Sequence, residues 1–327
     1  MEGNETGAAT SILSTAAFHY LPVQSAGTVY GVIGIRMGET EPDDFENSLA
    51  TAILNQCATS MEKEFISRKR EEETAMAKAE QLRANGAARL ALKTGAFGMP
   101  DLALAIRVAS ELDFELLTID GSGGGTGMGP NDMLDNWGVP SVLLHAKAHD
   151  YAFLRAAAGK KVVDLAMGGG LAKPSQAFKA LALGAPYVKA VCMSRSFMIP
   201  AFLGCNIEGA LHPERRERVH GAWSALPKTV LDIGDTPETI FAGYHALKER
   251  LGADEMAHIP YGAIAMWTMC DRLGAGLQHH MAGARKFGVE HIDRTDICAA
   301  NRETAQETGI PFITEQDDEL ARRIVLG

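Results

Sequence analysis

The sequence predicts an α/β protein in which parallel strands and helices alternate as part of a (β/α)₈ (TIM) barrel. Two observations predict this class. After residue 86, apolar strand-like runs alternate with helical runs at a spacing of about 25 residues, which is typical of parallel β/α units. Most of these strands also run directly into polar or glycine-rich segments. In such barrels the loops at the carboxyl ends of the strands carry the chemistry.

The composition is that of a soluble globular protein. The chain has 327 residues, 46% of them hydrophobic and 22% charged. A net charge of −10 argues against a nucleic-acid partner. The apolar runs are too short to cross a membrane, and Met1–Ala16 lacks the basic and apolar regions of a secretory leader. We therefore expect no nucleic acid and no membrane as partner.

The cysteines indicate a reducing compartment. The chain has five, at positions 57, 192, 205, 270 and 298, and none of them forms a C-x-x-C pair. This spacing argues against a disulfide scaffold and a tetrahedral zinc site, so we expect a cytoplasmic protein without a bound metal.

The expected elements follow in order. The predicted strands, five in number, cover residues 88–93, 114–120, 139–145, 160–167 and 187–193. Helical spacing covers residues 100–112, and a helix that a glycine ends covers "YAFLRAAAG". A third helix covers "KPSQAFKALALGA", and residues 206–327 are expected to form a helical extension of the same domain as residues 86–205. One of its helices should start near Pro237, after Thr236 as a cap.

Polar or glycine-rich loops follow four of these strands. They are Lys93-Thr94-Gly95, Asp120–Gly129, Gly168–Gly170 and Ser194-Arg195. Backbone N–H groups in a glycine run can hold a phosphate without interference from side chains. The alternative is that these are tight turns between strand and helix that merely need glycine.

Residues 1–85 differ from the rest of the chain. They carry −6 of the net charge of −10. Two β-rich runs, "FHYLPVQ" and "GTVYGVIGIRM", predict a strand pair, and a helix is expected from Phe45 to about Ala84. The second half of that helix is densely charged, with apolar residues at Met61, Phe65, Ala75, Ala79 and Leu82. This pattern is typical of a solvated or coiled-coil arm, which could join two copies as a homodimer.

Residues 17–85 also resemble a known family. "HYLPVQSAGTVYGVIGIRM" and "LATAILNQCATSMEKEFISRKREEETAMAKAEQLRAN" are similar to the end of the GAF-like domain and the signalling helix of Kdp-type potassium-responsive sensor histidine kinases. In that family a phospho-acceptor motif of the H-D-L-R-T-P type follows, whereas here "GAARLALKTG" does. We interpret residues 1–85 as a grafted fragment or a sensory remnant, so a chimera or a non-catalytic sensory or dimerisation protein is the alternative function.

The remainder, from about Leu90 to the C-terminus, resembles the FMN-binding domain of the glutamate synthase large subunit and its stand-alone bacterial relatives. The resemblance lies in "LALKTGAFGMPDLALAIRVASELDFELLTIDGSGGGTGMGP", "VVDLAMGGGLAKPSQAFKALALGAPYVKAVCMSR" and "NIEGALHPERR". It implies FMN across the barrel mouth, with reduced flavin passing a hydride to an imine such as that formed from 2-oxoglutarate and ammonia. The residues that match the family's cofactor site are Lys93, Gly123, Gly124, Gly125, Thr126, Gly127, Gly168, Gly169, Gly170, Ser194 and Arg195.

Lys93 and Asp120 are the expected catalytic residues. The resemblance implies that Lys93 lies near the flavin pyrimidine edge, where a cation stabilises negative charge on the reduced ring. The alternative for Lys93 is a solvated lysine on a loop. Asp120 either holds the flavin or the substrate, or caps the turn.

Two departures from that family stand out. Only Cys192 and Cys205 are available where full glutamate synthases bind a three-iron cluster, so we expect no iron–sulfur cluster, and the electron donor is unknown. The first three β/α units should also precede residue 88, where the kinase-like segment stands. Either the incomplete barrel fails to bind FMN tightly, or the N-terminal strands patch the sheet.

Overall fold

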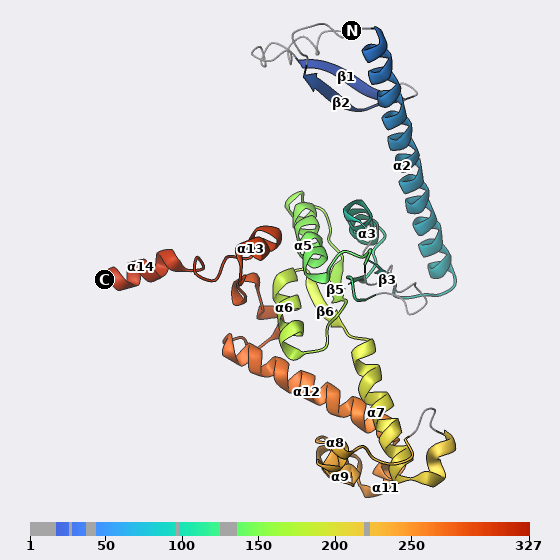
Figure 1. The fold of residues 1–327 in the computed structure, drawn as a ribbon, viewed down its shortest axis with the longest axis vertical. Coiled ribbons are helices and arrows are strands. Elements are labelled where there is room, and N and C mark those ends of the chain that lie inside the picture. Colours follow the sequence, from blue (N-terminus) through green and yellow to red (C-terminus); the bar gives the residue numbers. More distant parts are fainter. Residues whose placement is uncertain (1–17, 26–27, 37–43, 96–97, 125–135, 219–222) are drawn as a thin grey trace. The chain divides into compact units, whose positions relative to one another are not determined.

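The computed structural model describes residues 18–25, 28–36, 44–95, 98–124, 136–218 and 223–327 (Figure 1). The chain divides into two compact units, Met1–Gly86 and Ala87–Gly327. Within the described residues, no helix is both long enough and apolar enough to span a membrane.

The first unit consists of a strand pair and a long helix. Strands β1 (Phe18–Ser25) and β2 (Thr28–Arg36) pair antiparallel, with Phe18 opposite Arg36. Helix α2 (Asp44–Ala84) follows as one unbroken helix of 41 residues. The two strands form a sheet of their own, so the hypothesis that they patch the parallel sheet of the second unit is wrong.

A parallel sheet forms the centre of the second unit. Its strands are β3 (Ala91–Thr94), β4 (Leu116–Asp120), β5 (Asp164–Gly168) and β6 (Val188–Cys192), hydrogen-bonded in the order β3-β4-β5-β6. All three pairings are parallel. Because the strands follow one another both along the chain and across the sheet, each connection has to cross over the sheet through a helix.

Three helices make these crossovers: α3 (Met99–Glu111), α5 (Ser141–Ala157) and α6 (Pro174–Gly184). Helix α5 packs against both α3 and α6, while α3 also packs on β4 and α6 on β6. Alternate strand residues point to opposite faces of a sheet. The fully buried Leu117 and Ile119 of β4 therefore share one face, and Thr118 and Asp120 share the other.

The structure corrects the strand expected over residues 139–145. Helix α5 occupies this segment from Ser141 onward and continues through the residues expected to form a separate helix. The short run "VPSVLLH" has β-rich composition, but Leu144, Ala148 and Ala152 recur every four residues and are fully buried. The helical period over the longer window therefore decides the structure. The second unit has four parallel strands among its described residues, rather than the five expected.

The residues after β6 are helical and build a second core. Helix α7 (Arg195–Leu211) packs along α12 (Tyr261–Gly283), and Ile207 and Ile264 from these two helices are fully buried. The helix expected from Pro237 is interrupted, since α9 (Pro237–Ile240) ends before α10 (Tyr244–Leu251) begins. The remaining elements are η1 (Pro213–Arg218), α8 (Lys228–Leu231), α11 (Ala253–Met256), η2 (Val289–His291), η3 (Arg294–Asp296), α13 (Arg302–Thr308) and α14 (Asp318–Leu326).

The second unit is thus α/β, with a parallel sheet and crossover helices, which is consistent with part of a barrel. Parallel closure into a barrel takes about eight strands, and the described residues contain four. Strands β3 and β6 are the two edges of this open sheet.

Candidate functional site at the carboxyl edge of the sheet

The carboxyl ends of the parallel strands bring the predicted residues to one edge of the sheet. Lys93 lies near the end of β3, Asp120 ends β4, and Gly168 ends β5. Gly168 is paired in register with Asp120 on one side and with Cys192 of β6 on the other. Ser194 and Arg195 follow β6 and begin α7. The site therefore rests on the sheet register and not on loop conformation alone.

Lys93 and Asp120 form an ion pair. The ammonium Nζ of Lys93 lies 2.9 Å from Oδ2 of Asp120. The Lys93 side chain is 56% exposed and that of Asp120 is 9% exposed, so the carboxylate is buried beneath an accessible ammonium. A buried carboxylate needs a charged or hydrogen-bonding partner. The pair accounts for the burial of Asp120 and fixes a positive charge at the mouth of the site.

Glycines surround the other oxygen of Asp120. A Cβ atom at Gly124 would lie 2.4 Å from Oδ1 of Asp120, and one at Gly168 would lie 2.6 Å from the same atom. Any side chain at either position would displace the carboxylate. Glycine at these two positions therefore lets the loop after β4 and the end of β5 approach Asp120 closely. The alternative, that the glycines only form tight turns, does not explain this approach.

Gly169 combines a crowded position with a backbone conformation that favours glycine. Its φ of +102° is one that residues with side chains rarely adopt. A Cβ there would lie 2.5 Å from both the carbonyl oxygen of Gly121 and the hydroxyl oxygen of Ser141. The neighbouring Gly170 also has positive φ, at +71°, but a Cβ there would meet open space. The β5–α6 loop is therefore packed on one side and open on the other.

Hydrogen bonds join the loops that follow β4 and β5. The N–H of Gly121 donates to the carbonyl oxygen of Gly168 at 3.1 Å. Within the β4 loop, the N–H of Gly124 donates to the carbonyl oxygen of Gly121 at 2.7 Å. The hydroxyl of Ser141, in the first turn of α5, donates to the carbonyl of Gly169 at 2.9 Å. Sequence reasoning did not single out Ser141, because an isolated serine after a proline carries no pattern of its own.

The loop after β6 reaches back to the same place. The guanidinium of Arg195 donates a hydrogen bond to the carbonyl of Gly123. The hydroxyl of Ser196 is buried and has no hydrogen-bond partner within the described part of the chain. A buried hydroxyl without a partner costs free energy that a bound acceptor would recover. The predicted Gly125, Thr126 and Gly127 lie outside the described residues.

His145 lies beneath this edge and is 2% exposed. Its Nε2 lies 3.3 Å from the carbonyl oxygen of Ile119, so the neutral ring donates a hydrogen bond from that nitrogen. Burial lowers the pKa of His145 to about 4, although the Ile119 carbonyl and the charge of Asp120 oppose this shift. The ring is therefore neutral at pH 7 in the folded chain, and it supports the strand end as an uncharged group.

This burial predicts a pH-dependent stability. Because the pKa of His145 is lower in the folded chain than in the unfolded chain, unfolding below pH 6.5 is accompanied by proton uptake at this residue. The free energy of unfolding is therefore unaffected by His145 titration above the unfolded pKa of 6.5 and decreases as the pH falls toward the folded pKa of about 4. Between pH 7 and pH 5 the free energy of unfolding should fall by about 2 kcal/mol because of His145. Urea unfolding followed by tryptophan fluorescence measures it, since all three tryptophans lie after residue 87.

The matched variants for this prediction are His145→Gln and His279→Gln. His279 is exposed, so its replacement should leave the pH dependence as it is in the wild type. The His145→Gln variant should lose about 2 kcal/mol of the difference between pH 7 and pH 5. Equal pH dependence in both variants would contradict the burial of a neutral ring.

A cavity of about 1010 Å³ opens next to the glycine loops. It extends from Gly169 and Gly170 past the first turns of α5 and α6 to residues 296–310. Phe178 and His280, whose ring centroids lie 5.9 Å apart, belong to its wall. Sequence reasoning missed this cavity, because its walls come from segments more than 100 residues apart whose packing leaves no local pattern.

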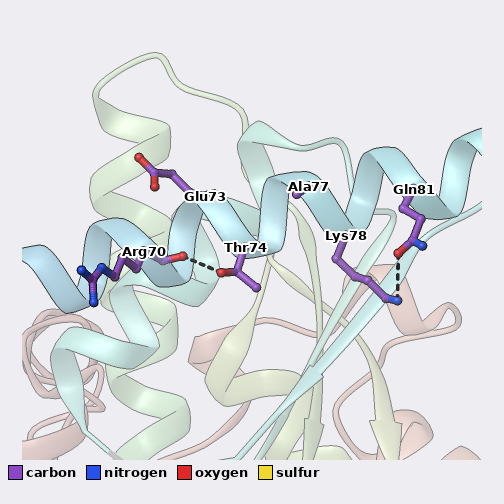
Figure 2. A pocket seen from close by; sticks show the side chains of 6 residues that line it. All are labelled: Arg70, Glu73, Thr74, Ala77, Lys78 and Gln81. Atoms are coloured by element: carbon purple, nitrogen blue, oxygen red, sulfur yellow. Dashed lines mark hydrogen bonds between the residues drawn. The ribbon is translucent and has the colours of Figure 1, made fainter.

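A second hollow lies along α2 in the first unit, with a volume of about 720 Å³ (Figure 2). It is lined by Arg70, Glu73, Thr74, Ala77, Lys78 and Gln81, which recur at helical spacing on one helix. In Figure 2 the ammonium of Lys78 donates to the side-chain oxygen of Gln81 at 3.1 Å, and the Thr74 hydroxyl donates to the Arg70 carbonyl at 2.7 Å. All six lining residues are exposed, so this hollow is a solvated helix surface.

The described residues hold no group of three or more His, Cys, Asp or Glu side chains that could bind a metal ion. Four of the cysteines, Cys192, Cys205, Cys270 and Cys298, are free thiols.

Comparison with known proteins yields one family. The family model described as a conserved region in glutamate synthase matches residues 67–214. The match covers all four strands of the parallel sheet and the loops that carry Lys93, Asp120 and Gly169. It supports a glutamate synthase domain here and suggests an oxidoreductase, while nothing supports the kinase-like reading of the first unit. No curated protein matches the chain.

Proposed function

We propose that residues 87–327 form an FMN-dependent oxidoreductase of the glutamate synthase type, which converts 2-oxoglutarate and ammonia to glutamate. The observation that carries the proposal is the Lys93–Asp120 ion pair at the carboxyl edge, beside glycines at positions 124, 168 and 169 where a Cβ would clash. The family match over residues 67–214 supports the same reading.

The residues at the edge fit FMN. Backbone N–H groups of Gly169 and Gly170 are suited to the phosphate because they offer donors without side chains, and the β5–α6 loop is open at Gly170. Arg195 adds a positive charge close to Gly123 in the loop after β4. The buried Ser196 hydroxyl has no hydrogen-bond partner among the described residues and can donate to a bound oxygen. When bound, FMN supplies the two-electron carrier that no side chain can provide.

Lys93 and Asp120 have distinct roles in this proposal. The exposed ammonium of Lys93 stabilises negative charge that develops at the mouth of the site, and it does so from a fixed position. Asp120 is buried and holds the ammonium in that position through its Oδ2. Asp120 is therefore a positioning residue for Lys93, and the alternative that it only caps a turn does not explain the ion pair.

The test is the formation of labelled glutamate by the full chain. The protein is mixed anaerobically with FMN reduced by dithionite, 2-oxoglutarate and ¹⁵N-ammonium, and the product is identified by mass spectrometry. The proposal predicts ¹⁵N-glutamate at a rate that depends on protein concentration and exceeds that of free reduced FMN alone. Formation of 2-hydroxyglutarate instead, or no product above the free-flavin rate, would reject the proposed reaction.

A second function is favoured by helix α2. Its apolar residues Ala75, Ala79 and Leu82 recur at a spacing of four and then three residues, which is that of a coiled-coil seam. We infer that α2 joins two copies of the chain in parallel, as the alternative dimerisation role requires.

A cysteine pair tests this second proposal. Leu82→Cys on the seam should give a disulfide-linked dimer on mild oxidation, because seam residues of parallel helices face each other across the two-fold axis. Met76→Cys is the matched control, since Met76 is exposed on α2 outside the seam. Equal cross-linking of the two variants, measured on a non-reducing gel against the wild type, would exclude the seam.

A further inference from the structure

The cavity beside the glycine loops shares no charged group with the candidate functional site. Lys93, Asp120 and Arg195 are absent from its described lining, which runs from the glycine loops along α5 and α6 to residues 296–310. Its volume of about 1010 Å³ lies at the upper end of the range for pockets that enclose small organic ligands. The cavity therefore has room for a molecule of its own.

Most of the cavity wall is apolar, and part of it is aromatic. The rings of Phe178 on α6 and His280 on α12 lie in the wall with centroids 5.9 Å apart. The aliphatic lining residues are Val142, Leu171, Leu183, Ile297 and Ile310. Leu183 and Ile310 also belong to one buried cluster, so the core fixes this part of the wall. Such a wall suits a flat, apolar ligand body.

Polar groups of the wall already have partners within the protein. The carboxylate of Asp296 accepts a hydrogen bond from the N–H of Asp293 at 2.9 Å and lies 3.5 Å from Nζ of Lys286. The side-chain oxygen of Gln176 accepts a hydrogen bond from the N–H of Ala172 at 2.9 Å. The negative charge of Asp296 is therefore balanced from within the protein, which leaves little attraction for a bound cation.

Lys179 of α6 brings a positive charge to the same wall. Its side chain is exposed, and no ion pair joins it to another residue in the described part of the chain. The first turns of α5 and α6, which also border the cavity, contain no acidic residue. The charge of the wall therefore favours an anion.

From these features we propose that the cavity is a second small-molecule site, which binds an aromatic anion. The flat body of the ligand lies against the wall formed by Phe178 and His280, and its acidic group pairs with the ammonium of Lys179. The flavin phosphate is proposed to bind at Gly169 and Gly170, at the border of the cavity and not at Lys179. Binding of the anion needs no flavin, so this proposal stands apart from the proposed function.

The experiment uses Cys298 as a reporter of occupancy in the full chain without flavin. Cys298 is an exposed thiol in the cavity wall, whereas Cys270 is an exposed thiol outside the described lining. Alkylation of both by iodoacetamide is followed by mass spectrometry in the presence of one of three probes. Naphthalene-2-sulfonate carries the aromatic body and the charge, 2-naphthol carries only the body, and methanesulfonate carries only the charge. The probe concentration that halves the alkylation rate of Cys298 gives the affinity at this site.

Naphthalene-2-sulfonate should slow the alkylation of Cys298 at least about fivefold and leave Cys270 unchanged, because a bound ligand covers most of the wall. It should bind about fivefold more tightly than 2-naphthol, the size expected of one partly exposed ion pair, and methanesulfonate should give no protection. Lys179→Met should remove this preference for the sulfonate. Lys160→Met, which changes an exposed lysine outside the described lining, should keep it.

Equal protection of Cys298 and Cys270, equal affinities for the sulfonate and 2-naphthol, or the same preference in both lysine variants would overturn the proposal. FMN alone should leave the alkylation of Cys298 unchanged. Slower alkylation with FMN would assign the cavity to the flavin and would also overturn a second site. A chain that binds the sulfonate in this manner but does not bind FMN supports the second site and counts only against the proposed function.

Discussion

Replacement of Gly169 by valine raises the dissociation constant for FMN by at least about 100-fold, because two costs fall on one loop. A φ of +102° is strained for any residue with a side chain, and more so for a β-branched one. In addition, a Cβ at this position would lie 2.5 Å from the Gly121 carbonyl and from the Ser141 hydroxyl. The β5–α6 loop must therefore move away from the β4 loop, and the N–H groups proposed to hold the phosphate move with it.

The matched control is Gly170→Ala. Gly170 also has positive φ, at +71°, but a Cβ there would meet no atom within 4 Å. Only the backbone cost of about 1–2 kcal/mol remains, so the affinity for FMN should fall by no more than about tenfold. Titration of each variant with FMN, followed by quenching of flavin fluorescence, measures both constants. Equal affinity of the two variants for FMN would show that the packing of Gly169 against Gly121 and Ser141 is not needed for FMN binding.

Replacement of Lys93 by methionine removes the second essential feature, the fixed positive charge. The catalytic rate should fall about 100- to 1000-fold, which is the typical effect of removing one preorganised charge or donor from a reaction centre. Methionine retains the length and much of the apolar stem of lysine, so the loop should keep its shape. The affinity for FMN should change by less than about tenfold, because the phosphate is proposed to bind at other residues.

Two comparisons make this prediction specific. Lys160→Met removes an exposed lysine before β5 and should leave the rate unchanged. Lys93→Arg restores the charge without the same geometry and should recover part of the rate. Steady-state rates of ¹⁵N-glutamate formation with saturating reduced FMN provide the measurement. A Lys93→Met enzyme as fast as Lys160→Met would show that the ammonium is a solvated loop charge, which is the alternative that the sequence leaves open.

The sequence predicts the strand ends and two of the three crossover helices, α3 and α6, whereas α5 differs from the expectation. Lys93, Asp120 and Gly168 were singled out because polar residues and glycines follow apolar runs, and parallel pairing then brings these positions together. The ion pair itself was not predictable. It depends on the in-register pairing of β3 with β4, and no pattern within one segment encodes the register between two segments.

The errors have physical causes. The valine and leucine content of segment 139–145 predicts a strand, whereas the burial of Leu144 and Ala148 on one face of α5 favours a helix. Ser141 and the cavity beside Phe178 depend on tertiary packing between distant segments, which leaves no trace in local sequence. The alternative in which the N-terminal strands patch the parallel sheet is wrong, because β1 and β2 form a separate two-stranded sheet.

The measurement that tests the account most directly is the visible absorption spectrum of the purified full chain titrated with FMN. The account predicts a perturbed flavin spectrum that saturates at one FMN per chain and is lost in Gly169→Val but kept in Gly170→Ala. A flavin spectrum identical to that of free FMN at all concentrations would contradict it. In that case the glycine loops and the Lys93–Asp120 pair preserve the architecture of a flavin site without binding the cofactor.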